Sequence, residues 1–364
     1  MAKMPRAPVV LVSWLLWAGC SSPPALVPND LATGADLAAP RVRTLTVTLT
    51  DGLSPPIELV VPEHTRSLTV VAVGDDHALY ALGSLRTPDG VEQVTLAQPP
   101  AMTLQQQYYG DQVPVLPTGL YQTIRVGTFT HVYPYAPGQT LAPGPMSLRI
   151  ASSAASGSVA VTLLLPEDDG ARVLHLNALT VTSVDTPAPA DSWRAPLQAI
   201  FDQAGITIVL DQVTAVTSAE FASISETPGT LPEPGDVYCR LALAGDGWVT
   251  SGALNLFLVE SLPGAIGGFT LGLPGPPVPT SYDFGVVVRA QANDAAAARA
   301  IGHEVAHFLN LHHVQDIGTF SGTAYPDPLD DTTPGQPNLM DAMGTTLTPG
   351  QAFSLSKSAL LVKE

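Results

Sequence analysis

The sequence predicts a multidomain protein in which an all-β sandwich precedes an α/β (α+β) domain with a mixed, twisted sheet. Three observations lead to this prediction. The chain has 364 residues and is 45% hydrophobic, enough for about two domains of roughly 150 residues each. Residues 41–170 form short runs of alternating hydrophobicity between turn signals. Residues 171–364 mix strand patterns with helical ones, which is typical of layers of helices on a sheet.

Residues 1–19 are organised like a signal peptide. Lys3 and Arg6 precede an apolar run at 9–18, which is shorter than the about 20 residues needed to cross a bilayer. Ala18-Gly19-Cys20 resembles the lipobox of bacterial lipoproteins, and this resemblance implies that Cys20 becomes the lipidated first residue. We therefore expect export, with Cys20 anchoring the protein to the outer membrane or cell surface; secretion without a lipid is the alternative.

The composition limits the function further. Residues 20–40 are rich in Pro, Ala, Asn and Asp without periodicity, which predicts a flexible tether. The net charge is −17 because only 15 Lys and Arg oppose 32 Asp and Glu. So few bases cannot neutralise many phosphates, which excludes nucleic acid as a partner. Of the two cysteines, Cys239 is left without a partner once Cys20 carries lipid, and we expect it to be a buried thiol.

The first domain is predicted from its strand spacing. Turn dipeptides such as Asp51-Gly52 and Asp89-Gly90 separate the short runs of alternating hydrophobicity, which indicates an antiparallel sandwich. The pattern resembles the jelly-roll accessory domains beside secreted bacterial peptidases. His64, His77 and His131 are too scattered for a metal site, so we expect ordinary surface or turn histidines. The expected strands are residues 41–50, 57–61, 67–73, 79–86, 91–96, 122–131, 146–151 and 158–165.

The second domain is predicted to contain five strands and two helices. Residues 214–253 are interpreted as a loop rich in Pro and Gly. The helix at 294–309 begins with Asn293 or Asp294 as its cap and contains several alanines, which favour helix. The expected strands are 172–184, 206–213, 254–262, 266–273 and 284–290, and the other helix spans 193–205.

The second helix carries a candidate metal site. His303 and His307 are one turn apart on one helix face, where two imidazoles can bind a single ion, and Glu304 lies beside them. His313 follows ten residues after His303, too far along a continuous helix to join the same site. The helix must therefore end and the chain turn back, and Asn310 is predicted to make this turn because asparagine tolerates a left-handed conformation.

The segment His303-Glu304-Val305-Ala306-His307 with Asn310 and His313 resembles the zinc-binding consensus of the metzincin metallopeptidases, with Asn310 at the usual glycine. Asn338-Leu339-Met340-Asp341 resembles their Met-turn, which places Met340 beneath the histidines. Residues 327–332 and 347–351 also resemble secreted bacterial members such as the pappalysins. The resemblance covers about 172–364. It implies peptidase activity, a five-stranded sheet and a substrate lying along an edge strand, here 266–273.

The predicted function is a monomeric zinc-dependent endopeptidase acting on proteins or peptides. His303, His307 and His313 would bind Zn²⁺, and Glu304 would be the general base for a metal-activated water. His312 is an alternative third ligand, and Met343 is an alternative to Met340. A third ligand from Glu364, as in peptidases similar to thermolysin, is nearly excluded because no other glutamate follows Glu304.

Three further alternatives stay open. An aspartate could replace His313 as third ligand. Asp327, Asp330 and Asp331 could hold Ca²⁺, because calcium prefers several carboxylate oxygens, or could form a solvated loop. Finally, the chain could be a noncatalytic surface lipoprotein that binds a ligand or glycan through its sandwich and keeps a structural zinc site. The intact Glu304 argues against this last interpretation, because a structural site needs no base.

Overall fold

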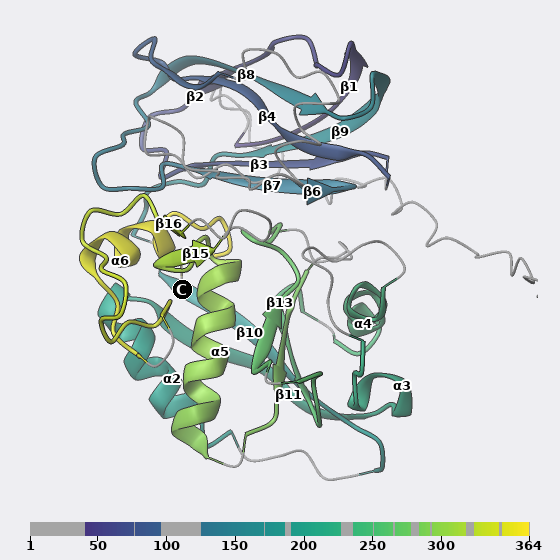
Figure 1. Ribbon diagram of the computed structural model, residues 1–364. Helices are drawn as coiled ribbons and strands as arrows, with labels where there is room; N and C mark the ends of the chain where they lie inside the picture. Colours follow the sequence, from purple (N-terminus) through teal and green to yellow (C-terminus); the bar gives the residue numbers. More distant parts are fainter. Residues whose placement is uncertain are drawn as a thin grey trace, which may run out of the picture.

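The computed structural model describes residues 41–363 except 76, 96–124, 171, 186–190, 227–235, 250, 265, 278–283, 292, 318–323 and 342–343. The predicted signal peptide (1–19), tether (20–40) and lipidation site (Cys20) lie outside these residues. Within the described part of the chain, no helix is both long and apolar enough to cross a membrane. The protein is mostly β-sheet with few helices, and it contains a β-sandwich followed by a helix-flanked sheet (Figure 1).

The sandwich consists of two antiparallel sheets with strand orders β1-β9-β3-β7 and β2-β8-β4-β5, and β6 pairs with β4. Side chains that alternate between buried and exposed positions along the strands form its core. In β2, Ile57, Leu59 and Val61 are buried, whereas Glu58 and Val60 face solvent. The strands are β1 (Val42–Thr50), β2 (Ile57–Val61), β3 (Leu68–Val73), β4 (Leu79–Arg86), β5 (Glu92–Thr95), β6 (Arg125–Val126), β7 (Thr128–Tyr133), β8 (Gly144–Ser152) and β9 (Ser156–Leu164).

One prediction about this half is wrong. His131 was expected at the surface or in a turn, but it lies in β7, whose six residues are all buried. The sheet that contains β3 and β7 lies between the other sandwich sheet and the second half of the protein (Figure 1), so both of its faces are covered. His64 and His77 are exposed, as expected. Burial lowers the pKa of His131 to about 4.

The second half contains a five-stranded sheet with the order β11-β10-β12-β14-β13. The first four strands are parallel, and β13 pairs antiparallel with β14 at one edge. Five elements were predicted as strands, and all five are strands. They are β10 (Val173–Thr182), β11 (Thr207–Thr217), β12 (Leu254–Val259), β13 (Gly268–Thr270) and β14 (Val286–Arg289).

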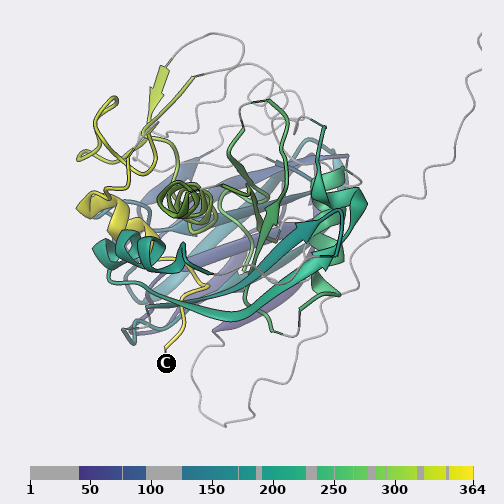
Figure 2. The same ribbon diagram turned by 90° about the horizontal axis from the view of Figure 1, so that it is seen from below.

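Helices cover both faces of this sheet (Figures 1 and 2). On one face, α2 (Arg194–Phe201) and α5 (Asp294–Phe308) pack through a core that includes Leu197 and Ile301. On the other face, α3 (Ala219–Ala222) and α4 (Val237–Asp246) pack through Phe221 and Leu241. The loop predicted for 214–253 is therefore wrong in part: Asp236 caps α4 by accepting from the Tyr238 N–H at 2.6 Å. Cys239 in α4 is fully buried, as expected.

The chain ends in a compact segment beside α5. It contains the short strands β15 (Gln315–Ile317) and β16 (Ala324–Pro326), which pair with each other, and the helix α6 (Pro349–Leu355). Thr348 and Gln351 form a capping box at the start of α6. Gln351 also exchanges two amide hydrogen bonds with buried Asn338, at 2.8 and 2.9 Å, which fixes the turn at 338–340 against this helix.

Candidate metal centre

Helix α5 presents two histidines because one of its faces is fixed in the core. Asn293 caps the helix by accepting from the N–H groups of Ala295 and Ala296 at 2.9 and 3.2 Å. Ile301 and Val305 are fully buried in the core that α5 shares with the sheet. This packing fixes the rotation of the helix about its axis. His303 and His307, one turn apart, therefore face the segment that follows the helix.

The helix ends where the sequence predicts. Asn310 has a φ of +104°, which confirms that it adopts the positive φ that few residues other than glycine tolerate. The chain then reverses, and the Leu311 N–H donates to the Ala306 carbonyl at 2.9 Å. The Asn310 side chain donates to the Ser354 hydroxyl of α6 at 3.3 Å. This turn returns His313 to the level of His303 and His307.

Three imidazole nitrogens meet at one point. The Nε2 atom of His307 lies 3.1 Å from those of His303 and His313, which are 3.3 Å from each other. His303 Nδ1 lies 2.7 Å from the Leu339 carbonyl oxygen, and His307 Nδ1 lies 2.7 Å from that of Leu311. A carbonyl only accepts hydrogen bonds, so both Nδ1 atoms carry the proton and, in the neutral rings, both Nε2 atoms present lone pairs.

This donor set fits a zinc ion. Lone pairs that face each other at 3.1 Å repel, and a shared cation converts the repulsion into coordination. The nitrogens of a tetrahedral zinc site with bonds of about 2.0–2.1 Å lie about 3.3 Å apart, close to the distances observed here. Burial and the neighbouring His303 and His313 hold the pKa of His307 well below its usual value, which keeps the ring neutral for coordination. Carbonyl partners on Nδ1 orient such ligands.

The structure places the competing residues elsewhere. His312 is buried with its ring 5.7 Å from that of Tyr135, and it does not belong to the converging group. Met340 is buried in the core that contains α5. Its turn contacts the site twice: Leu339 accepts from His303, and the Met340 carbonyl accepts from the Val314 N–H at 3.1 Å. Met343 lies outside the described residues.

Glu304 lies in a closed environment beside the histidines. Its side chain is buried, and Oε2 is 2.7 Å from the hydroxyl of Thr270 in the edge strand β13. The same hydroxyl is 2.8 Å from the Glu304 carbonyl oxygen. A Cβ at Gly268 would lie 2.5 Å from Glu304 Cγ, so only glycine leaves space for the carboxylate. Burial raises the pKa of Glu304 to about 7, against the Thr270 hydrogen bond and His313, which lower it.

The predicted calcium cluster is not assembled. Asp331 accepts from the Gly350 N–H at 2.7 Å and the Thr348 hydroxyl at 2.9 Å, so it caps α6. Asp327 accepts from the Thr332 hydroxyl at 2.5 Å and stabilises its own turn. In the parts of the chain that the structure describes, the three histidines are the one group of His, Cys, Asp or Glu close enough to share an ion. The carboxylates of Asp327 and Asp331 thus contact different local turns and do not converge on a common point.

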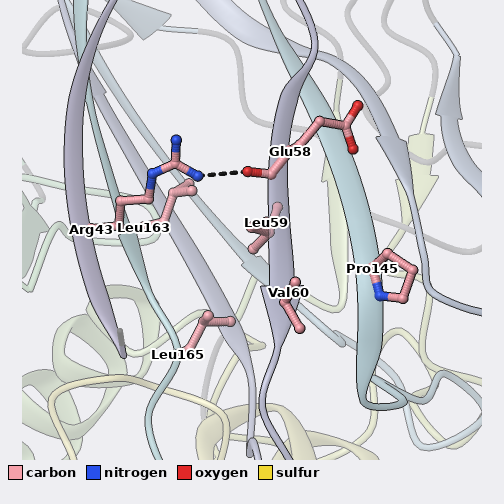
Figure 3. Close-up of a pocket in the computed structure, with 7 residues that line it drawn as sticks. All are labelled: Arg43, Glu58, Leu59, Val60, Pro145, Leu163 and Leu165. Atoms are coloured by element: carbon pink, nitrogen blue, oxygen red, sulfur yellow. Dashed lines mark hydrogen bonds between the residues drawn. The ribbon is translucent and has the colours of Figure 1, made fainter. Parts of the chain in front are cut away.

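A second concave feature lies on the sandwich, away from the histidines. It is a hollow of about 420 Å³ between the edge strands β1 and β2, walled mainly by aliphatic side chains (Figure 3). Arg43 crosses it and donates to the Glu58 carbonyl at 2.6 Å. The lining residues are Arg43, Glu58, Leu59, Val60, Pro145, Leu163 and Leu165.

Sequence reasoning missed the residues that surround Glu304. Thr270 lies 34 positions before Glu304, and no local pattern connects them. A weak signal existed in Gly267-Gly268 within the predicted edge strand, because glycine inside a strand often marks a close approach of another group. The carbonyls of Leu311 and Leu339 were missed as well, since backbone acceptors have no sequence signature.

Comparison with known proteins adds little. No protein-family model and no curated protein matches this chain. A structure of the infectious bursal disease virus Gx strain is 18% identical over 39% of this chain and 37% of its own, with a TM-score of 0.15. A mutant VP2 protein of the same virus, from T=1 particles, is 19% identical over 41% of this chain and 38% of its own, also at 0.15. A TM-score this low supports no statement about fold or function.

Proposed function

We propose that this protein is a zinc-dependent endopeptidase similar to the metzincins. The observation that carries the proposal is the convergence of His303, His307 and His313 at 3.1–3.3 Å, with the buried carboxylate of Glu304 beside them. A site that served only to stabilise the fold would need no such carboxylate and is usually closed by a fourth protein ligand. The resemblance to this family implies a five-stranded sheet, and the second half of the protein contains a sheet of five strands.

The residues have distinct roles in this proposal. The three histidines would hold zinc as neutral imidazoles. Zinc bound there would supply Lewis acidity, which polarises a peptide carbonyl and makes water more acidic. Glu304 takes the proton from the attacking water as its oxygen bonds to the carbonyl carbon, and then passes it to the leaving nitrogen as the C–N bond breaks. Thr270 positions Glu304 through its hydroxyl.

The edge strand is the proposed substrate site. Among the residues that the structure describes, β13 pairs with β14 on one side only, so its other side can pair with an extended peptide. Thr270 belongs to this strand and contacts Glu304, so a peptide paired with β13 would run beside the base. The proposed place of action is the cell envelope, with the chain attached through a lipid on Cys20.

Metal analysis combined with a peptide-library digest tests the proposal. The purified protein is expected to contain one zinc per chain and to cleave internal peptide bonds. A chelator should stop cleavage, and added zinc should restore it. Protein that contains neither zinc nor cleavage activity after zinc is supplied would refute the proposal. Zinc binding without cleavage would favour the noncatalytic alternative.

A further inference from the structure

The segment 310–314 is the part of the metal centre that does not belong to α5. His313 in this segment meets His303 and His307, whereas the neighbouring His312 points to the sandwich. The His312 ring is 5.7 Å from the ring of Tyr135 at an angle of 51°, and both residues are buried. One side of the segment therefore faces the metal site, and the other packs against a different layer of the protein.

Tyr135 is held firmly within the sandwich. It follows β7 and is 1% exposed in the core between the two sheets. Its N–H donates to Gln139 Oε1 at 2.7 Å, and the Ala136 N–H donates to the same oxygen at 3.2 Å. The Tyr135 ring is therefore a fixed surface for His312 and not a mobile side chain.

A second contact holds the other end of the segment. The Val314 carbonyl accepts from the Asp327 N–H at 3.1 Å, and Leu329, two residues further, packs in the sandwich core at 4% exposure. The segment with His313 is thus connected to the sandwich on both sides of the ligand.

The C-terminal segment adds a third connection. Buried Arg66 of the sandwich donates to the carbonyls of Ser358 and Leu361, both at 3.0 Å. Ser67 donates to the Lys357 carbonyl at 2.6 Å. This segment directly follows α6, whose Ser354 hydroxyl contacts Asn310 at the start of the ligand segment.

We infer that the β-sandwich is a positioning part of the metal centre, in which Tyr135 packs against His312 and holds the segment that presents His313. His313 lies on a non-helical segment, and ordering such a segment costs conformational entropy. If contacts with the sandwich already hold the segment in place before the metal binds, this cost does not reduce the zinc affinity. The inference rests on the proposed function in that zinc is taken as the ion. It assigns the sandwich a role in the zinc site itself, beyond capturing a substrate or glycan.

Zinc affinity of full-length variants, measured by competition with a chromophoric chelator, tests this inference. Tyr135→Leu removes the ring that faces His312 and is expected to loosen the segment that presents His313. Loss of a direct partner of a metal ligand lowers affinity by about 10–100-fold, and since Tyr135 acts through the neighbouring His312, we expect the lower end, about tenfold weaker zinc binding. The cobalt spectrum of Tyr135→Leu should change as well, because it reports the ligand geometry. Tyr135→Phe keeps the ring and should bind zinc as the unmodified protein does.

Tyr133→Leu is the matched control. Tyr133 lies two residues away in the same core, is also 1% exposed, and donates its hydroxyl to the Thr140 carbonyl. The substitution Tyr133→Leu removes a ring comparable to that of Tyr135 and should lower the melting temperature without changing zinc affinity. Should Tyr135→Leu fail to fold, Gln139→Ala loosens the same turn from a half-buried position, and a loss of affinity is expected there too.

The outcomes separate this inference from the proposed function. Weaker zinc binding in Tyr135→Leu or Gln139→Ala, but not in Tyr133→Leu, supports it. Equal affinity in all folded variants would overturn it and leave the zinc site intact. Equal losses in Tyr135→Leu and Tyr133→Leu would also overturn it, since they would reflect general stability. No zinc binding by the unmodified protein would overturn both the inference and the proposed function.

Discussion

The hydroxyl of Thr270 makes the sharpest test of how the edge strand and the base cooperate. Thr270→Val keeps the shape and strand preference of the side chain but removes the group that lies 2.7 Å from Glu304 Oε2. Glu304 is 8% exposed, so solvent cannot replace the lost partner. A hydrogen bond to a charged group contributes about 1.5–3 kcal/mol. The Thr270 hydroxyl proton is shared between Glu304 Oε2 and the Glu304 carbonyl oxygen, so we take the lower limit of this range, about 1.5 kcal/mol. This free energy corresponds to a roughly tenfold lower kcat.

Steady-state kinetics of zinc-loaded protein measure this effect. KM should stay near its original value, because pairing of a substrate with β13 uses backbone groups that the substitution leaves in place. Thr270→Ser retains the hydroxyl and should keep most of the activity, which makes it the matched control. Thr270→Val with an unchanged kcat and full zinc content would refute the positioning role of this residue.

Three other predictions concern the structure around the site and the sandwich. Gly268→Ala should lower kcat at least as much as Thr270→Val, because the new Cβ lies 2.5 Å from Glu304 Cγ, whereas Gly267→Ala, with no atom within 4 Å, should be nearly neutral in the same assay. Asn310→Ala should lower the free energy of unfolding by about 1–2 kcal/mol, because φ is +104° there. Asn310→Gly should lower it by less, since glycine tolerates a positive φ, and thermal melts of the two variants measure the difference. His131 has a folded pKa of about 4, below the 6.5 of the unfolded chain, so only the unfolded state takes up its proton as pH falls below 6.5. Wild type should therefore lose about 2.5 kcal/mol more than His131→Leu between pH 7.5 and 4.5 in urea melts, and parallel losses would contradict this.

Local signals predicted much of this structure. The limits of β2 and β4 agree with the predicted strands, because alternation and turn dipeptides act over a few residues. The extent of α5 and the turn at Asn310 were also predictable. Helix spacing places His303 and His307 together, and the third histidine forces a reversal that few residues allow. The candidate metal site was therefore accessible from one continuous segment.

The rest depends on contacts between distant segments. The burial of His131 was missed because its alternating strand suggested one exposed face, whereas two layers cover β7. α4 was missed because Pro and Gly surround it, although the Asp236 cap and the apolar residues Val237 and Leu241, four positions apart, indicate a helix. The contacts of Thr270 with Glu304 and of Tyr135 with His312 join different elements, and only the packing of those elements creates them.

The central claim is that Glu304 acts as the base of a zinc peptidase, and peptide cleavage by Glu304→Gln tests it most directly. The substitution keeps the size of the side chain and removes its ability to take a proton. The variant is expected to hold one zinc per chain and to show no cleavage, whereas Glu260→Gln, at an exposed glutamate of the same half, should cleave normally. Cleavage by zinc-loaded Glu304→Gln at the rate of the unmodified protein would contradict the account.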